Sequence, residues 1–220
     1  MRSDPQITAV LIAAANSAAQ HRPSPAQTLA QALQGLGAAQ SMNLVLGLAL
    51  KPSAQLSDPC LADYAERQWD VSQRTAEYGR MLAIQLHLDQ ERCYCAGLLH
   101  RLGDLAVLRC LQEWRLAGGE LQTLQIDEAL AEFGAAYGSA LRTRWRLPLE
   151  LRELIAAAYH LGGGVYSREA LVMNLVTQAA LLEPDDGDAI MALANSKTAR
   201  LLKVGTSELS RLINTEQSAV

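Results

Sequence analysis

Three prolines in this 220-residue chain each follow a residue type that commonly caps the start of a helix, and this repeated pattern constrains the fold most. The pairs are Asp4-Pro5, Ser24-Pro25 and Asp58-Pro59. Aspartate and serine side chains accept hydrogen bonds from the first free backbone amides of a helix, and proline suits the first helical position because its missing amide hydrogen is not needed there. The sequence therefore predicts helices that begin at residues 5, 25 and 59, and Asp89 and Ser167 offer two further caps.

The apolar composition also favours helices. Half of the residues are hydrophobic but only 5% are aromatic, so alanine and leucine supply most of the apolar surface. No convincing run of alternating residues rich in valine, isoleucine or threonine is present, although strands favour such residues. We expect an all-α, multi-helix bundle with further helices over residues 38–50, 105–114, 126–146, 149–160 and 189–202.

Charge and hydropathy limit the partners. The net charge of -4 argues against binding nucleic acid by broad neutralisation of its phosphates. The apolar segment 7–15 lacks the positive charge that precedes the core of a secretory signal, because Asp4 offsets Arg2. The next apolar run, 44–50, is far shorter than the roughly 20 residues of a membrane span. We expect a soluble, cytoplasmic protein with no nucleic-acid or membrane partner.

The four cysteines, Cys60, Cys93, Cys95 and Cys110, include one C-x-C pair and no second pair that would complete a zinc site. On a helix, Cys93 and Cys95 point about 200° apart, which is poor geometry for holding one ion. We therefore expect buried thiols in a reducing compartment, and neither a metal nor another cofactor.

The basic residues Arg142, Arg144 and Arg146 surround Trp145 at the predicted end of a helix. The helix dipole favours cations at this end, which indicates a solvated helix terminus. The alternative is a docking patch for an acidic partner.

The pair His100 and Asp104 has the i, i+4 spacing that can place two side chains on one face of a helix. Gly103 lies between them, and two ligands alone hold a metal weakly, since hydrolytic metal sites generally use at least three protein ligands. By itself the pair indicates an ordinary surface or core histidine.

The segment around this pair, residues 95–105 (C-A-G-L-L-H-R-L-G-D-L), resembles the A-G-L-L-H-D-I-G-x-L motif of HDOD domains, which are regulatory relatives of the HD-type metal-dependent phosphohydrolases. Further resemblances to the family's motifs follow in the same order, at residues 3–8 (S-D-P-Q-I-T), 15–18 (A-N-S-A), 35–37 (G-L-G) with 43–46 (N-L-V-L), 69–72 (W-D-V-S), 138–148 (G-S-A-L-R-T-R-W-R-L-P) and 159–160 (Y-H). The resemblance implies an N-terminal helical subdomain, residues 1–55, and an HD-like subdomain, residues 56–220.

The chain departs from the catalytic relatives at the positions that would bind metal. In those enzymes histidines and aspartates hold ions that lower the pKa of bound water for attack on a phosphate ester. By the resemblance, Arg101 replaces the aspartate of the His-Asp doublet, Val71 replaces an upstream histidine, and Gly134 replaces the histidine expected four residues before Gly138. The resulting degenerate pocket comprises Val71, His100, Arg101, Asp104, Gly134 and His160. We expect Arg101 to pair with a nearby carboxylate, Asp70 or Asp104.

These departures imply a non-catalytic bacterial signal-transduction module that acts as an interaction or scaffold domain for other signalling proteins. Two alternatives stay open. One is a metal-dependent nucleotide phosphohydrolase that uses His100, Asp104 and His160. The other is a receptor for a nucleotide second messenger whose phosphate meets Arg101.

The N-terminal subdomain is expected to be shortened, because HDOD domains usually carry further helices before the D-P-x-L-T motif and this chain begins almost at that motif. Loss of a covering helix leaves an apolar face. We expect a partner or a second copy of the chain to cover that face.

Overall fold

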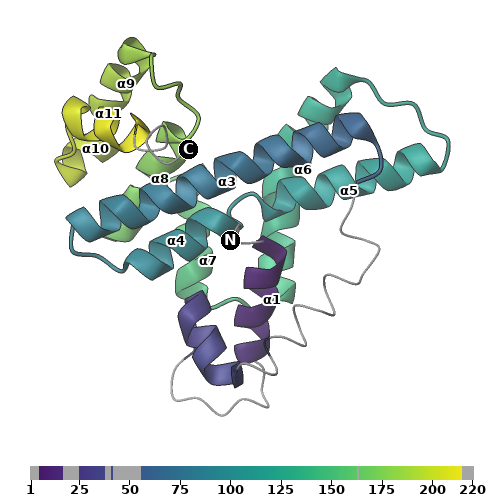
Figure 1. Cartoon of the computed structure of the whole chain (residues 1–220), viewed down its shortest axis with the longest axis horizontal. Coiled ribbons are helices and arrows are strands. Elements are labelled where there is room, and N and C mark those ends of the chain that lie inside the picture. The colour runs from purple at the N-terminus through teal and green to yellow at the C-terminus, as the bar shows by residue number, and fades with distance from the viewer. Residues whose placement is uncertain (1–4, 17–24, 38–40, 42–55, 163, 215–220) are drawn as a thin grey trace. The chain divides into compact units, whose positions relative to one another are not determined.

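A computed structural model describes residues 5–16, 25–37, 41, 56–162 and 164–214 (Figure 1). These residues form helices joined by turns and contain no strand, so the predicted all-α class is confirmed. The chain divides into two compact units, one formed by Met1–Asp70 with Leu99–Arg152 and the other by Val71–Leu98 with Glu153–Val220. This division differs from the expected subdomains 1–55 and 56–220, whose boundary falls outside the described residues and stays a prediction.

The first unit begins with α1, Pro5–Ala15, which starts at the predicted proline. The Asn16 side chain then fixes the following segment, because its Nδ2 donates to the Ala26 carbonyl (2.9 Å) and its Oδ1 accepts from the Ala26 amide (2.6 Å). The next helix covers residues 29–37 and does not start at Pro25 as predicted. Thr28 provides the cap instead, since its Oγ1 accepts from the Gln31 amide at 3.2 Å. The predicted helix over 38–50 lies outside the described residues, apart from residue 41, which is helical.

Helix α3, Pro59–Gln85, begins where Asp58 caps it, with Asp58 Oδ1 accepting from the Leu61 amide at 3.0 Å. Its N-terminal part packs on α5, Leu102–Leu116, and on α6, Thr123–Arg144 (Figure 1). The core of this three-helix arrangement consists of Leu61, Tyr64, Leu108 and Ile126. Packing of these side chains fixes the two helices that carry the candidate site.

The second unit contains α4, Gln90–Leu99, most of α7, Leu149–Tyr159, and α8, Arg168–Ala179. Both predicted caps are confirmed, since Asp89 Oδ1 accepts from the Arg92 amide (2.9 Å) and Ser167 Oγ accepts from the Ala170 amide (3.1 Å). These local signals set where α4 and α8 begin.

Three short helices complete the second unit: α9, Gly187–Ala194, α10, Lys197–Leu202, and α11, Thr206–Asn214 (Figure 1). The prediction of one helix over 189–202 was wrong. Ser196 interrupts it, because its backbone is extended and its Oγ caps α10 by accepting from the Ala199 amide at 3.2 Å. Helix α11 buries its apolar residues Leu209, Leu212 and Ile213.

The cysteines are free and differ in exposure. Cys93 and Cys95 are buried, Cys60 is half-buried and Cys110 is exposed. The expectation of buried thiols was therefore wrong for Cys110, an exposed residue of α5. Within the described residues, no helix combines the length and the apolar character that crossing a membrane requires.

Candidate functional site

Arg101 lies at the junction between α4 and α5, where it occupies the N-cap position of α5. Its Nη1 atom donates to Asp104 Oδ2 at 2.9 Å and to Gln68 Oε1, on α3, at 2.8 Å. The side chain of Arg101 is 22% exposed and that of Asp104 only 6%. The cation at the altered doublet position therefore forms a largely buried ion pair with Asp104, one of the two carboxylates proposed from the sequence, rather than with Asp70.

Two opposing effects act on the pKa of Asp104. Burial raises the pKa of its carboxyl group, while the charge and the hydrogen bond of Arg101 lower it, and burial is the larger effect. Removing a carboxylate from water is costly unless a partner compensates, so Arg101 stabilises the ionised form of Asp104. Arg101 and Asp104 therefore form a largely buried pair of opposite charges within the first unit.

Gly134, on α6, faces this pair directly. A Cβ atom built on Gly134 would overlap Asp104 Oδ1. The position where the resemblance implies a histidine therefore has no space for any side chain while Asp104 keeps this orientation. The carboxylate of Asp104 occupies that space.

The close approach of α5 and α6 depends on further glycines. A Cβ atom on Gly103 would overlap the Gly134 carbonyl oxygen and would lie 2.5 Å from the Gly138 backbone nitrogen. One turn further along α6, a Cβ atom on Gly138 would lie 2.8 Å from Arg142 Nη1. The two helix backbones are therefore in contact at Gly103, which positions Asp104 against α6.

The structure brings together only part of the predicted pocket. Arg101, Asp104 and Gly134 are in contact within the first unit, and His100 lies beside Arg101 in the chain with its side chain fully buried. Val71 and His160 belong to the second unit. Val71 is half-buried in α3, and His160 is exposed just after the end of α7.

Gln68 is the contact residue that the sequence analysis missed. It accepts a hydrogen bond from Arg101 across 33 positions of sequence, which no local pattern reveals. One signal was present: Gln68 lies three residues before Val71, so the two positions share a face of α3. That spacing is the one feature of the sequence that links Gln68 to the predicted pocket residues.

The residues present do not fit a divalent metal ion of the HD type. The Asp104 carboxylate that would serve as a ligand already binds the guanidinium of Arg101 through Oδ2, and its Oδ1 is packed against Gly134. A second cation at this carboxylate would meet the positive charge of Arg101 at short range. Within the described residues, no group of three or more His, Cys, Asp or Glu side chains is arranged to hold a metal.

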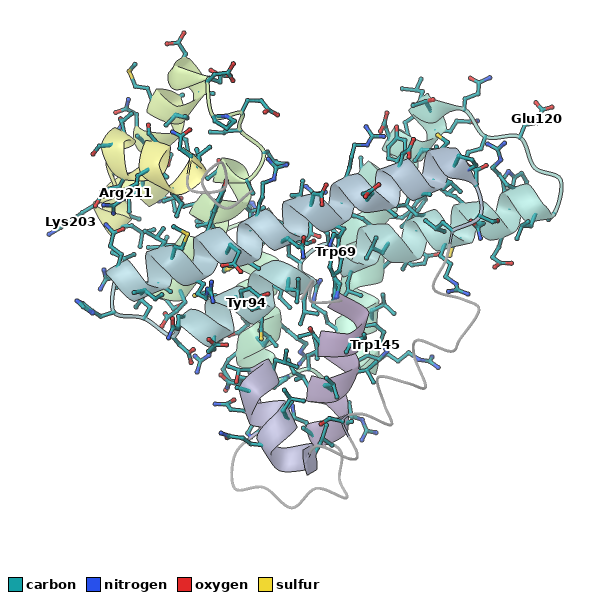
Figure 2. The ribbon with its side chains drawn as sticks, viewed as in Figure 1. Trp69, Tyr94, Glu120, Trp145, Lys203 and Arg211 are labelled. Atoms are coloured by element: carbon teal, nitrogen blue, oxygen red, sulfur yellow. The ribbon has the colours of Figure 1, made fainter. Side chains whose placement is uncertain are left out.

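The proposed basic patch is smaller than predicted. Arg142 is buried, with 5% of its surface exposed, because it follows Gly134 and Gly138 along the face of α6 that packs on α5. Arg144 and Arg146 are exposed, and Trp145, labelled in Figure 2, is half-buried at the end of α6. The solvated helix end therefore consists of two arginines, and its role as a docking patch stays a prediction.

The fold and the site define an all-helical domain with a largely buried arginine–aspartate pair at the start of α5. The HDOD domain family matches residues 1–161 of the chain. This protein belongs to the HDOD family, as its motifs predicted. No curated protein matches the chain.

Solved structures share the fold. The MmoQ response regulator of Methylococcus capsulatus str. Bath is similar over 95% of this chain and 85% of its own, with a TM-score of 0.67 and 20% identity. A second structure, from Shewanella amazonensis SB2B, is described as a "Putative metal-dependent phosphohydrolase". It is similar over 96% of this chain and 81% of its own, with a TM-score of 0.50 and 16% identity. At these identities the likeness concerns the fold alone.

Proposed function

We propose that this protein is a non-catalytic signal-transduction module, in which the degenerate HD pocket is a structural element and the helical surface binds other signalling proteins. The observation that carries the proposal is the contact of Arg101 with Asp104, together with the contact of Asp104 with Gly134. A hydrolytic metal needs free carboxylate and imidazole ligands and an open position for water. Here a guanidinium and a glycine stand at two of those positions.

Relatives supply further support. One structural neighbour is described as a response regulator. The other is described in terms of phosphohydrolase chemistry, which makes the enzyme reading the alternative that an experiment must address. The family assignment alone does not decide between a scaffold and an enzyme. The residues at positions 101 and 134, an arginine and a glycine, favour the non-catalytic function.

The test measures manganese binding and phosphodiester hydrolysis by the purified protein. Titration calorimetry with Mn²⁺ and turnover of bis(p-nitrophenyl) phosphate are compared for the native chain, Arg101→Asp and Asp104→Asn. We expect no metal-dependent turnover in any of the three, because restoring one carboxylate leaves Gly134 in place. Metal-dependent hydrolysis by the native chain that Asp104→Asn abolishes would overturn the proposal.

A nucleotide screen tests the receptor alternative with the same protein. A ligand present at 100 times its dissociation constant stabilises the folded state by about 2.7 kcal/mol, which thermal denaturation detects. We expect no shift with mononucleotides or cyclic dinucleotides, because Nη1 of Arg101 is already engaged by Gln68 and Asp104. A shift that disappears in Arg101→Met would replace the scaffold proposal with the receptor function.

The proposal also includes the expectation that a partner or a second copy of the chain covers an apolar face of the N-terminal subdomain, residues 1–55. Light scattering of the full chain tests it, with a species larger than the monomer as the expected result. A monomer that binds no hydrophobic dye would contradict it.

A further inference from the structure

A groove between α5 and α6 exposes an unusual concentration of aromatic surface. It has a volume of about 270 Å³ and is lined by Val107, Cys110, Leu111, Trp114, Ala129, Phe133 and Tyr137. Trp114 is 58% exposed, and Phe133 and Tyr137 are each 43% exposed. None of the lining residues comes from α3, and of the lining residues only Leu111 also packs against the core that α3 shares with α5 and α6. Contiguous apolar surface rimmed by polar residues is typical of an interaction site.

The aromatic residues are few in this protein, so their placement is informative. The chain has three Trp, six Tyr and a single Phe, and that Phe lies in the groove rather than in a core. Large aromatic side chains contribute most of the binding energy at many protein interfaces. Exposing Trp114 and Phe133 without a partner would forgo the stabilisation that burial gives.

Carboxylates surround the groove. Glu113, Glu128 and Glu132 are exposed, and each immediately precedes a groove-lining residue, Trp114, Ala129 and Phe133 respectively. Consecutive helical residues point about 100° apart, so each carboxylate lies at the edge of the apolar surface. None of the three forms an ion pair with another described residue. Arg109, which is half-buried, precedes the groove residue Cys110 in the same way, so the rim carries three carboxylates against one guanidinium and its net charge is negative.

The spacing of the lining residues matches a helix as the occupant. On α5 they fall at i, i+3, i+4 and i+7, and on α6 at i, i+4 and i+8, so two helical ridges border one groove. A third helix packs naturally between such ridges. A peptide that binds by strand addition needs the edge of a sheet, and the described residues contain no strand.

We propose that this groove binds an amphipathic helix of a partner protein, with large apolar side chains on one face and lysine or arginine beside that face. The proposal rests on the proposed function, in that it names the surface and the kind of partner a scaffold of this type would use. A second copy of the chain is a poorer occupant, because two identical grooves facing each other would oppose their acidic rims. An anionic membrane surface would likewise be repelled by the glutamates.

The protein carries its own reporter for the test, since Cys110 lines the groove and is exposed. The probe is a synthetic peptide of about 18 residues, without Trp or Cys, in which Leu recurs at i, i+3, i+4 and i+7 and Lys fills the flanking positions. We measure how fast a maleimide modifies Cys110 with and without the peptide, and follow the fluorescence of Trp114 in a parallel titration of the variant in which Trp69 and Trp145 are replaced by Phe. We expect saturable protection of Cys110 that weakens as salt is added.

Variants separate groove binding from general attraction of opposite charges. Glu132→Lys is expected to weaken binding about fivefold, because it replaces an attraction at the rim with a repulsion. Glu66→Lys, an exposed site on α3, makes the same change in net charge and is expected to leave affinity within about twofold. Phe133→Ala is expected to abolish protection, and circular dichroism checks that the variant stays helical.

Two further probes complete the test. A peptide with the same composition in scrambled order, and a peptide with Glu in place of Lys, should not protect Cys110. Equal binding of the scrambled peptide, equal losses in Glu132→Lys and Glu66→Lys, or preferential binding of vesicles of phosphatidylcholine with phosphatidylserine would each overturn the proposal. These results do not depend on manganese binding or on hydrolysis. Peptide binding to the groove can therefore be disproved while the non-catalytic function stands, and the non-catalytic function can be disproved while peptide binding stands.

Discussion

The Oδ1 atom of Asp104 lies where the Cβ atom of any larger residue at position 134 would have to be. The same carboxylate receives Arg101 on its other oxygen at 2.9 Å. One buried aspartate therefore contacts two of the three positions, 101 and 134, at which the resemblance implies a departure from the catalytic pattern. Its surroundings explain why an arginine and a glycine are compatible with each other in this pocket.

Gly134→Ala is expected to destabilise the protein by about 1–3 kcal/mol, because the new methyl group overlaps Asp104 in a packed interior. Without that overlap, replacing glycine by alanine within a helix is expected to stabilise it by about 1 kcal/mol. A loss of stability would therefore indicate the overlap with Asp104. Urea denaturation measures the free energy of unfolding. Gly187→Ala is the matched control, because a Cβ atom at that helical glycine meets nothing within 4 Å and should be neutral or stabilising. In an Asp104→Ala background the substitution at 134 should be tolerated, and equal costs in both backgrounds would contradict the contact.

Arg101→Met is expected to cost about 2–3 kcal/mol at neutral pH, because it leaves a buried carboxylate without its cation. The double variant Arg101→Met with Asp104→Leu should recover part of that loss. Arg80→Met removes the exposed pair that Arg80 forms with Glu77 and should cost less than about 1 kcal/mol. A large loss of stability in Arg80→Met, or no loss in Arg101→Met, would contradict the conclusion that the buried ion pair contributes more to stability than the exposed one.

The cost of Arg101→Met is also expected to shrink as the pH falls. The pKa of Asp104 is raised in the folded state, so its contribution to stability is fully present below the ordinary value of 3.8 and is lost as the pH rises through the raised pKa. Because Arg101 lowers this pKa, its removal raises the pKa further and makes neutral pH more unfavourable. Unfolding free energies of the variant and the native chain at about pH 4.5 and about pH 7 measure the difference. A cost that is the same at both pH values would indicate that Asp104 is not the group involved.

The four cysteines are expected to react in an order set by burial. Cys110 is exposed and should be alkylated first by iodoacetamide at mildly alkaline pH. Burial, together with nearby Glu169 and Asp89, raises the pKa of Cys93 to about 12, so this thiol should stay unmodified until the chain unfolds. Mass spectrometry of proteolytic fragments identifies the labelled residue. Early labelling of Cys93 in the folded protein would contradict the packing of α4.

Ser196→Ala is expected to destabilise the C-terminal helices by about 1 kcal/mol, because the Ala199 amide loses the hydroxyl that caps α10. Ser207→Ala, at an exposed position inside α11, is the matched control and should have little effect. Thermal denaturation of both variants measures the difference. If the two substitutions have equal effects, the cap does not stabilise the break between α9 and α10.

Local signals made most helices predictable. Asp58, Asp89 and Ser167 each cap a helix within three residues of their own position, so sequence alone located those starts. The errors also have local causes. Ser196 interrupts a segment whose apolar spacing continues through it, and Thr28 competes with Ser24 as a cap only four residues away.

The contacts of the site could be predicted only where the two residues lie close together in the chain. Arg101 and Asp104 lie three residues apart, and Asp104 was one of the two carboxylates, with Asp70, expected to pair with Arg101. The contact of Arg101 with Gln68 and that of Gly103 with Gly134 join distant segments, so they depend on how α3, α5 and α6 pack. The burial of Arg142 had an unused signal, because Gly134, Gly138 and Arg142 recur at four-residue intervals along one face of α6.

The backbone contact between α5 and α6 also limits how this sequence can change over generations. A histidine at position 134 would require Asp104 to turn away, and Asp104 is held by Arg101. An aspartate at position 101 would place two carboxylates together without a cation, so neither single change is expected to be neutral. Such mutual dependence means that metal ligands at these two positions would have to be introduced together rather than one at a time. The touching glycines therefore restrict the order in which substitutions at positions 101 and 134 can accumulate.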